Sequence, residues 1–181
     1  MHYTMHTVAA VLYPQALATS VTLPMEILQA ASQMASVDAR GAASGVRFLL
    51  AGRDRQPVTL GSGIMLQPEL AFADLPPLDL LLLPAIWRNP LRAVNGARDW
   101  RGLLREQATR GTRICSVGTA SYLLAEAGLL DGRPATTHWN YFEQFSQRYP
   151  AVDLKTRHLI TQSDNIYCVG SVNSIADLMV H

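Results

Sequence analysis

ICSVGTASYLLAEAGLLDGRPATTHW, residues Ile114–Trp139, is the stretch that decides the fold of this chain. It predicts a short buried strand over Arg113–Val117, a sharp turn at Gly118 and a helix over Thr119–Ala127. A strand that turns abruptly into a helix lifts one side chain above the sheet, into the dipole field of the helix N-terminus. Enzymes place a cysteine or serine at this point. Here the residue is glycine, so the chain has the backbone plan of an active site without a reacting atom.

Composition places the chain among globular proteins of one domain. Its 181 residues are 49% hydrophobic and 16% charged, which is enough apolar material for a core. The net charge is only +1, and the basic residues are scattered along the sequence. DNA binding requires a clustered basic face. We therefore expect any contact with DNA to be made by another part of the protein.

Cysteine usage and hydropathy exclude several other classes. Cys115 and Cys168 lie in apolar runs without C-x-x-C or His/Cys spacing, so neither a disulfide scaffold nor a metal site is expected, and no cofactor is implied. The N-terminal residues lack the features of a signal peptide. The longest apolar run, around Leu80–Leu83, is too short to cross a bilayer. These features predict a cytoplasmic protein that makes no membrane contact.

Apolar runs alternate with amphipathic segments along the rest of the chain. The first helix is expected to open at Thr22 as its cap, with Pro24 near the first turn. The other expected helices are Ala97–Thr109, Trp139–Tyr149 and one that begins near Ser174. The expected strands are Thr7–Tyr13, Val46–Ala51, a hairpin of Val58–Leu60 and Ile64–Leu66, Leu78–Leu83, Arg113–Val117, Val152–Leu154, Leu159–Thr161 and Ile166–Val169. This alternation predicts an α/β fold, a doubly wound parallel sheet with helices on both faces.

The last expected helix reaches the end of the sequence after about two turns. Ile175, Leu178 and Met179 give this helix an apolar face. We therefore expect it to continue in the natural protein. On this interpretation residues 1–181 form one domain, cut within its last helix.

Several motifs of the chain resemble those of one protein superfamily. The longest is LLAEAGLLDGRPATTHW at Leu123–Trp139, supported by PME at Pro24–Glu26, LLLLP at Leu80–Pro84, RYP at Arg148–Pro150 and GSVNSIAD at Gly170–Asp177. They resemble the class I glutamine-amidotransferase-like, PfpI-type superfamily. More narrowly, they resemble the N-terminal sensor domain of AraC/XylS-type transcriptional regulators. The resemblance covers essentially the whole chain and implies a flavodoxin-like domain, with a helix-turn-helix module expected beyond residue 181.

The chain differs from the enzymatic members of that superfamily at the positions of the nucleophile, the base and the oxyanion hole. Gly118 stands at the nucleophile position and has no atom that attacks a carbonyl. Thr119 follows it, where peptidase-like relatives often carry a histidine base. Ala85 and Ile86 stand where many relatives have two glycines whose N–H groups help to form the oxyanion hole. The resemblance therefore implies a domain without catalytic residues. Gly118 taken alone is equally explained as relaxed backbone, because glycine adopts the elbow conformation freely.

We expect a small-molecule effector to bind over Gly118, at the edge of the sheet where doubly wound folds bind ligands. The residues expected to flank the effector are Glu26, Ile86, Trp87, Thr119 and His138. The resemblance places Glu26 beside the elbow. Its alternative role is a first-turn carboxylate that complements the helix dipole. For His138 the alternative is a capping residue, with Trp139 packed beside it.

The sequence leaves three functions open. The leading hypothesis is a sensor domain that binds an effector, forms a homodimer and passes its state to a DNA-binding domain. The second is a small-molecule hydrolase, hydratase or glyoxalase-type enzyme that uses Cys115, although a cysteine inside a strand is expected to be inert core. The third is a dimerisation module without a ligand.

Overall fold

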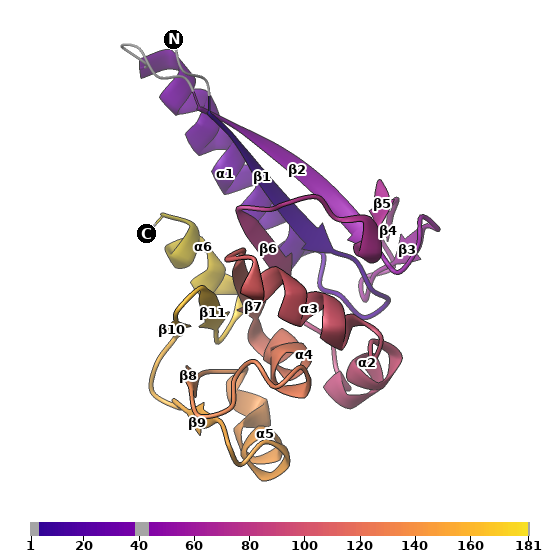
Figure 1. The fold of residues 1–181 in the computed structure, drawn as a ribbon, viewed down its shortest axis with the longest axis vertical. Helices are drawn as coiled ribbons and strands as arrows, with labels where there is room; N and C mark the ends of the chain where they lie inside the picture. The colour runs from indigo at the N-terminus through magenta and orange to yellow at the C-terminus, as the bar shows by residue number, and fades with distance from the viewer. Residues whose placement is uncertain (1–3, 39–43, 181) are drawn as a thin grey trace.

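A seven-stranded sheet runs through the protein, whose computed structural model describes residues 4–38 and 44–180 (Figure 1). The strand order is β10-β11-β7-β6-β1-β2-β5. The strands are β1 (Thr4–Val11), β2 (Ser44–Gly52), β5 (Leu70–Ala71), β6 (Leu80–Leu83), β7 (Arg113–Val117), β10 (Ile160–Ser163) and β11 (Ile166–Val169). All neighbouring strands are parallel except β10 and β11.

The remaining elements connect and cover this sheet. Two short strand pairs lie outside it: β3 (Val58–Thr59) with β4 (Met65–Leu66), and β8 (Pro134–Ala135) with β9 (Asp153–Leu154). The helices are α1 (Thr19–Asp38), α2 (Pro90–Gly96), α3 (Trp100–Thr109), α4 (Ser121–Glu126), α5 (Phe142–Arg148) and α6 (Val172–Val180). Short 3-10 turns are η1 (Phe72–Asp74), η2 (Gly118–Ala120) and η3 (Trp139–Tyr141).

Both faces of the sheet are covered, because alternate residues of each buried strand pack into cores on opposite sides. On one side Val11 packs with Leu104 of α3 and with the apolar residues of α2 and α4. On the other side Leu82 packs with Val21 of α1 and Ile175 of α6. Figure 1 shows the same division, with α1 and α6 on one side and α3 on the other. The predicted doubly wound fold is therefore confirmed.

At one edge of the predicted parallel sheet, the pairing of β10 with β11 is antiparallel. β10 and β11 are joined by only two residues, Asp164 and Asn165. Such a short turn forces the chain straight back, whereas parallel neighbours need a long crossover connection. Asp164 has a φ of +52°, a conformation common in tight hairpin turns. The hairpin expected around Gly61–Gly63 is confirmed as the β3–β4 pair.

The first helix begins earlier than expected. α1 starts at Thr19, so Thr22 is not its cap, and Pro24 lies inside the helix. Proline has no N–H, so the bond from Pro24 to the Ser20 carbonyl is lost, and the helix continues because the rest of its backbone is paired. The expected placement of Glu26 in the first turn is therefore wrong. That residue lies about two turns into the helix and is exposed.

The helix expected over Ala97–Thr109 is present as α3, Trp100–Thr109, and the separate helix α2 precedes it. Asn89 caps α2, accepting a hydrogen bond from the Arg92 backbone N–H at 3.2 Å, and Pro90 occupies its first position. Both residues are ordinary helix-start signals. These two signals mark the start of α2 in the sequence, whereas the apolar pattern alone misses it.

The last helix begins at Val172, two residues before the expected Ser174. The Ser171 hydroxyl accepts a hydrogen bond from the Ser174 N–H at 3.3 Å, as a helix cap does. α6 packs on α1 across one face of the sheet. His181 lies outside the described residues.

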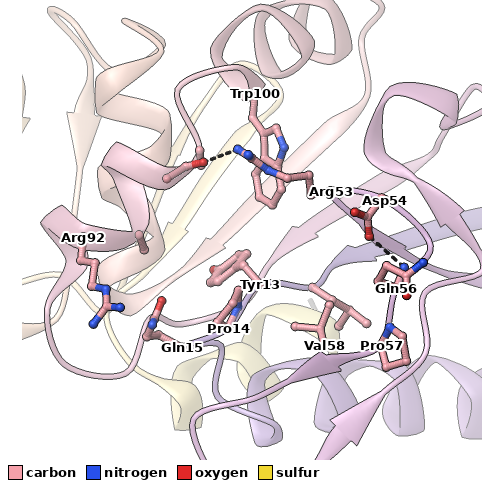
Figure 2. Close-up of a pocket in the computed structure, with 14 residues that line it drawn as sticks. Tyr13, Pro14, Gln15, Arg53, Asp54, Gln56, Pro57, Val58, Arg92 and Trp100 are labelled. Atoms are coloured by element: carbon pink, nitrogen blue, oxygen red, sulfur yellow. Dashed lines mark hydrogen bonds between the residues drawn. The ribbon is translucent and has the colours of Figure 1, made fainter.

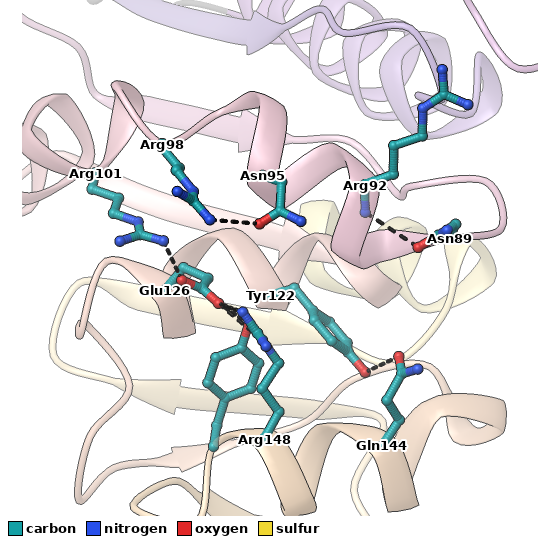
Figure 3. A network of polar contacts seen from close by, with 10 residues as sticks. Asn89, Arg92, Asn95, Arg98, Arg101, Tyr122, Glu126, Gln144 and Arg148 are labelled. Atoms are coloured by element: carbon teal, nitrogen blue, oxygen red, sulfur yellow. Dashed lines mark hydrogen bonds and ion pairs between the residues drawn. The ribbon is translucent and has the colours of Figure 1, made fainter.

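A carboxylate at the end of α4 joins three helices on the other face (Figure 3). Glu126 accepts hydrogen bonds from Arg148 at the end of α5 at 2.6 Å and from the Tyr149 hydroxyl at 2.8 Å. It also pairs with Arg101 of α3. We call this group the Glu126 clasp. Nearby, the buried Tyr122 donates its hydroxyl hydrogen to the Gln144 side chain at 3.0 Å.

Candidate functional site

The elbow predicted from the sequence is present at the end of β7. Val117 is the last residue of the strand, and Gly118 turns the chain into η2 with a φ of +52°. This left-handed conformation favours glycine over other residues by about 1–2 kcal/mol. A Cβ atom on Gly118 would meet the Cβ atoms of His138 at 3.7 Å and Ala85 at 3.8 Å. These are ordinary contacts, so the backbone conformation, and not the lack of space, disfavours a side chain here.

A cavity of about 520 Å³ opens over Gly118. It lies at the carboxyl ends of β6, β7 and β11 and beside the connection that follows β1. The chain reverses its strand order between β1 and β6, and doubly wound proteins bind ligands at such a switch point. The lining residues are Leu17, Ala85, Ile86, Trp87, Arg88, Gly118, Thr119, His138, Asn140, Tyr141, Ser171, Val172 and Asn173. We call this space the elbow cavity.

The structure brings most of the residues proposed from the sequence to this cavity. Ile86, Trp87, Gly118, Thr119 and His138 all line it. Glu26 does not, because α1 starts at Thr19 and carries that side chain away from the strand ends. Sequence reasoning missed Arg88, although it directly follows Trp87, and the start of α6, because that helix was expected two residues later.

The backbone N–H groups after β6 are already paired inside the protein. The Ala85 N–H donates to the Ser20 hydroxyl at 2.9 Å, and the Ile86 N–H donates to the Thr119 hydroxyl at 3.1 Å. That hydroxyl donates in turn to the Ile86 carbonyl at 2.8 Å. Stabilising an oxyanion requires donors aimed at empty space. At this loop the two N–H groups instead tie the wall of the cavity to α1 and to the elbow.

His138 combines the two roles considered for it. Its Nδ1 accepts a hydrogen bond from the Asn140 N–H at 3.3 Å and so caps η3, and its side chain also lines the cavity. Burial lowers the pKa of His138 below its usual value. The ring is therefore neutral at pH 7, with the hydrogen on Nε2. The Trp139 ring lies beside the His138 ring, with centroids 5.5 Å apart, but 71% of the surface of Trp139 is exposed, so it is not a buried residue.

Trp87 and Arg88 form the rim of the elbow cavity. Trp87 is 47% exposed, and the Arg88 guanidinium lies 5.6 Å from the centre of its indole ring. Arg88 has a φ of +58°, an uncommon conformation for a residue with a side chain. Among the described residues that line the cavity, none is acidic.

Cys115 lies away from this site. Its thiol is fully buried in the core beneath α1 and α6, and it does not line the elbow cavity. Burial raises the pKa of the Cys115 thiol strongly, and burial also raises the pKa of Cys168 to about 11. A nucleophilic cysteine needs the opposite shift, since the thiolate is the reactive form. Both residues are placed as core residues.

A second cavity of about 410 Å³ lies at the carboxyl ends of β1 and β2, against α2 and α3 (Figure 2). The Tyr13 and Trp100 rings form its apolar wall, with centroids 6.0 Å apart. Arg53 lines it as well, but it is paired with Asp99 at 2.7 Å. Nothing in the sequence had pointed to this cavity.

Residues 4–38 and 44–180 contain neither a metal cluster nor a membrane span. No group of three or more His, Cys, Asp or Glu side chains is placed there to hold a metal ion. Within the same residues, no helix combines the length and apolar character needed to span a bilayer.

Two proteins are similar to this chain in sequence over most of its length. The isonitrile hydratase of Pseudomonas putida is 29% identical over 167 residues, which are 92% of this chain and 65% of that enzyme. The HTH-type transcriptional regulator CdhR of Pseudomonas aeruginosa is 35% identical over 135 residues, which are 74% of this chain and 39% of the regulator. The chain thus spans less than two thirds of the length of either protein.

Solved structures and a family comparison agree with these relatives. The crystal structure of an AraC family transcriptional regulator from Pseudomonas putida matches with a TM-score of 0.78 and 23% identity, covering 97% of this chain and 89% of that one. Drosophila melanogaster DJ-1beta matches with a TM-score of 0.75 and 16% identity, covering 98% of this chain and 88% of the other. The DJ-1/PfpI family matches residues 6–168. The PfpI-type resemblance is confirmed, and the chain belongs to the DJ-1/PfpI family.

Proposed function

We propose that this chain is the cytoplasmic effector-sensing domain of an AraC-type transcriptional regulator. A small molecule binds in the elbow cavity, and the domain catalyses no reaction. The observation that carries the proposal is the cavity of about 520 Å³ over an elbow whose central residue, Gly118, has no side chain. The similarity to regulators, including CdhR and an AraC family structure, supports the same function.

The chemistry of the site supports a domain without catalysis. The N–H groups of Ala85 and Ile86 donate to Ser20 and Thr119, so they are not free to stabilise an oxyanion. An enzyme that used Cys115 would need its thiol at the cavity, and that thiol is buried beneath α1 and α6. The similarity to an isonitrile hydratase makes a direct assay necessary. We expect no amidase, hydratase or glyoxalase turnover, and activity that is lost in a Cys115→Ser variant would overturn this part of the proposal.

DNA binding and dimerisation complete the proposed regulator. We place DNA binding in a helix-turn-helix domain outside residues 1–181, which fits a chain that covers 39% of CdhR. We propose that the domain forms a homodimer, because regulators of this kind read paired half-sites with two-fold symmetry. α1 has a surface suited to association, being almost uncharged and exposing 69% of Met34. Sedimentation that shows only monomer at tens of micromolar would contradict the dimer.

The ligand site is tested by filling the elbow cavity. We would screen metabolites by thermal shift and then compare the wild type with Gly118→Leu and Gly118→Cys. A ligand at a hundredfold excess over its Kd stabilises its site by about 2.7 kcal/mol. We expect this stabilisation in the wild type and in Gly118→Cys, whose small side chain has space. We expect none in Gly118→Leu, whose side chain projects into the cavity.

Gly111→Leu is the matched control. Gly111 has a φ of +83° and open space around it, so leucine there brings similar backbone strain without entering the cavity. This variant should lose stability but keep the ligand-dependent increase. If Gly118→Leu folds and is stabilised as much as the wild type, the ligand binds elsewhere and the proposed site is wrong.

A further inference from the structure

The charge of the elbow cavity identifies the kind of ligand that would fit it. The resemblance to the PfpI-type superfamily had placed a carboxylate, Glu26, beside the elbow. The structure removes that carboxylate from the cavity, since Glu26 is exposed on α1 and does not line it. Among the described lining residues the formal charge is a single arginine, Arg88, because His138 is neutral at pH 7. The charge that a ligand would meet is thus the reverse of the expected one.

Arg88 is available to bind an anion. Arg53, Arg101, Arg110, Arg133 and Arg148 pair with carboxylates, but among the described residues Arg88 has no acidic partner. Its contact is with the Trp87 ring, 5.6 Å from the guanidinium carbon. A guanidinium over an aromatic ring uses its flat face, and its N–H donors lie in the plane of the group. Those donors remain free to form paired hydrogen bonds with a carboxylate.

The other walls of the cavity add to this preference. Ser171, Val172 and Asn173 line it, and they form the start of α6, a helix of nine residues. The N-terminal end of a helix carries partial positive charge. The rest of the lining carries no formal charge and combines apolar residues, such as Ile86 and Val172, with polar ones, such as Asn140. One full positive charge beside apolar surface suits a monoanion with an apolar body better than a phosphate dianion, whose second negative charge would have no partner.

We propose that the elbow cavity binds a small monocarboxylate, with its carboxylate on Arg88 and its apolar part against Ile86 and Val172. This inference rests on the proposed sensing function and names the chemical class of its effector. It makes Arg88 the residue that selects a carboxylate over a neutral or cationic molecule of the same shape.

The test uses a thiol placed in the cavity, so it does not require the natural effector. In a Gly118→Cys protein the thiolate sulfur attacks the CH₂ carbon of iodoacetate or iodoacetamide, the C–S bond forms and iodide leaves. The two reagents have nearly the same shape and differ by one negative charge. Their rate ratio, normalised to free cysteine, therefore reports the potential in the cavity, and any change in the pKa of the introduced thiol cancels. The wild type, whose two cysteines are buried, gives the background.

We expect Arg88→Gln to lower the iodoacetate-to-iodoacetamide ratio by about two- to fivefold, the range that Coulomb's law gives for a unit charge across a solvated cavity. Arg98→Gln is the matched control, because it removes the same charge from an exposed site outside the cavity and should leave the ratio unchanged. If Gly118→Cys fails to fold, the same rate ratio is measured on the thiol that Val172→Cys introduces. A ratio that does not respond to Arg88→Gln overturns the carboxylate assignment but leaves the site in place.

A protection experiment then tests the ligand class directly. We expect hexanoate to slow iodoacetamide labelling of the cavity thiol, and hexanamide and hexylamine to slow it much less. The hexanoate effect should be lost in Arg88→Gln and kept in Arg98→Gln. Equal protection by the three compounds, or none by hexanoate, overturns the proposal. If both cysteine variants fold and neither iodoacetate nor iodoacetamide labels the introduced thiol at position 118 or 172, the cavity is closed and the proposed sensing function itself fails.

Discussion

The Glu126 clasp makes a quantitative prediction about stability. Glu126 is only 11% exposed in its side chain, and its carboxylate is shared by Arg101, Arg148 and Tyr149. Glu126→Gln keeps the shape of the side chain but removes the charge. Each arginine pair is partly exposed and contributes no more than about 1 kcal/mol. The hydrogen bond from Tyr149 to a charged acceptor adds about 1.5 kcal/mol or more, and the desolvation cost of the carboxylate offsets part of the sum.

We therefore expect Glu126→Gln to lower the free energy of unfolding by about 2 kcal/mol, measured by urea denaturation at pH 7. For a domain of this size the same change lowers Tm by about 4–8 °C. The matched control is Asp164→Asn in the exposed pair with Arg133, where the aspartate side chain is 74% exposed. Asparagine tolerates the positive φ of that residue, so we expect a loss below about 0.5 kcal/mol.

The pH dependence of this difference tests its electrostatic origin. Burial raises the pKa of Glu126, but hydrogen bonds from Arg148 and Tyr149 more than offset it and hold the pKa below its usual value of 4.5. A carboxyl whose pKa is lower in the folded state stabilises the fold above pH 4.5 and loses this effect as pH falls through the folded pKa. The gap between wild type and Glu126→Gln should therefore shrink between pH 5 and pH 3. A gap that stays constant with pH, or that equals the Asp164→Asn effect, would refute the reasoning.

Three further predictions concern the elbow and the cores. Gly118→Ala should lower the free energy of unfolding, measured by urea denaturation, by about 1–2 kcal/mol, because Gly118 has a φ of +52°. Gly96→Ala, at the end of α2 with open space around it, should be neutral or stabilising. Equal effects of the two substitutions would contradict the backbone argument. Cys115 should react with a thiol reagent only on unfolding, so rapid labelling of the native protein would show that it is not core. His138 should titrate by NMR below pH 6.5 because burial lowers its pKa. Because the unfolded chain binds that proton at a higher pH than the folded protein does, the free energy of unfolding should fall below pH 6.5, and it should fall less in His138→Asn. An NMR titration midpoint for His138 above pH 6.5 would contradict the burial of this ring.

Most of the fold could be predicted because buried parallel strands appear as continuous apolar runs. The strand Arg113–Val117 and the turn at Gly118 lie where the sequence places them. Errors concentrate where two signals compete. Thr22 and Pro24 together resemble a helix start, but α1 begins at Thr19, where Leu17 and Ser20 are hydrogen-bonded to the backbone of Ala85.

Part of the candidate site was also predictable, because the ends of the buried strands can be located in the sequence. Residues directly after strands, such as Trp87 and Gly118, must gather at one edge of a parallel sheet. Glu26 was misplaced because α1 starts three residues earlier than expected, so that residue lies almost one turn further along the helix and outside its first turn. That Arg88 has no acidic partner within residues 4–38 and 44–180 depends on which side chains meet in space, and no spacing in the sequence records that.

α6 is a single rigid element that extends from the elbow cavity to the surface of α1. Its first residues, Val172 and Asn173, line the elbow cavity, and its length packs against α1. A nine-residue helix is about 13 Å long and behaves as a stiff rod, because each of its turns is hydrogen-bonded to the next. A molecule that displaces Val172 by a fraction of an ångström therefore displaces the far end of the helix and its seam with α1 as well. On the proposed sensing function, a bound molecule would in this way alter the contact between α6 and α1, which it does not itself touch.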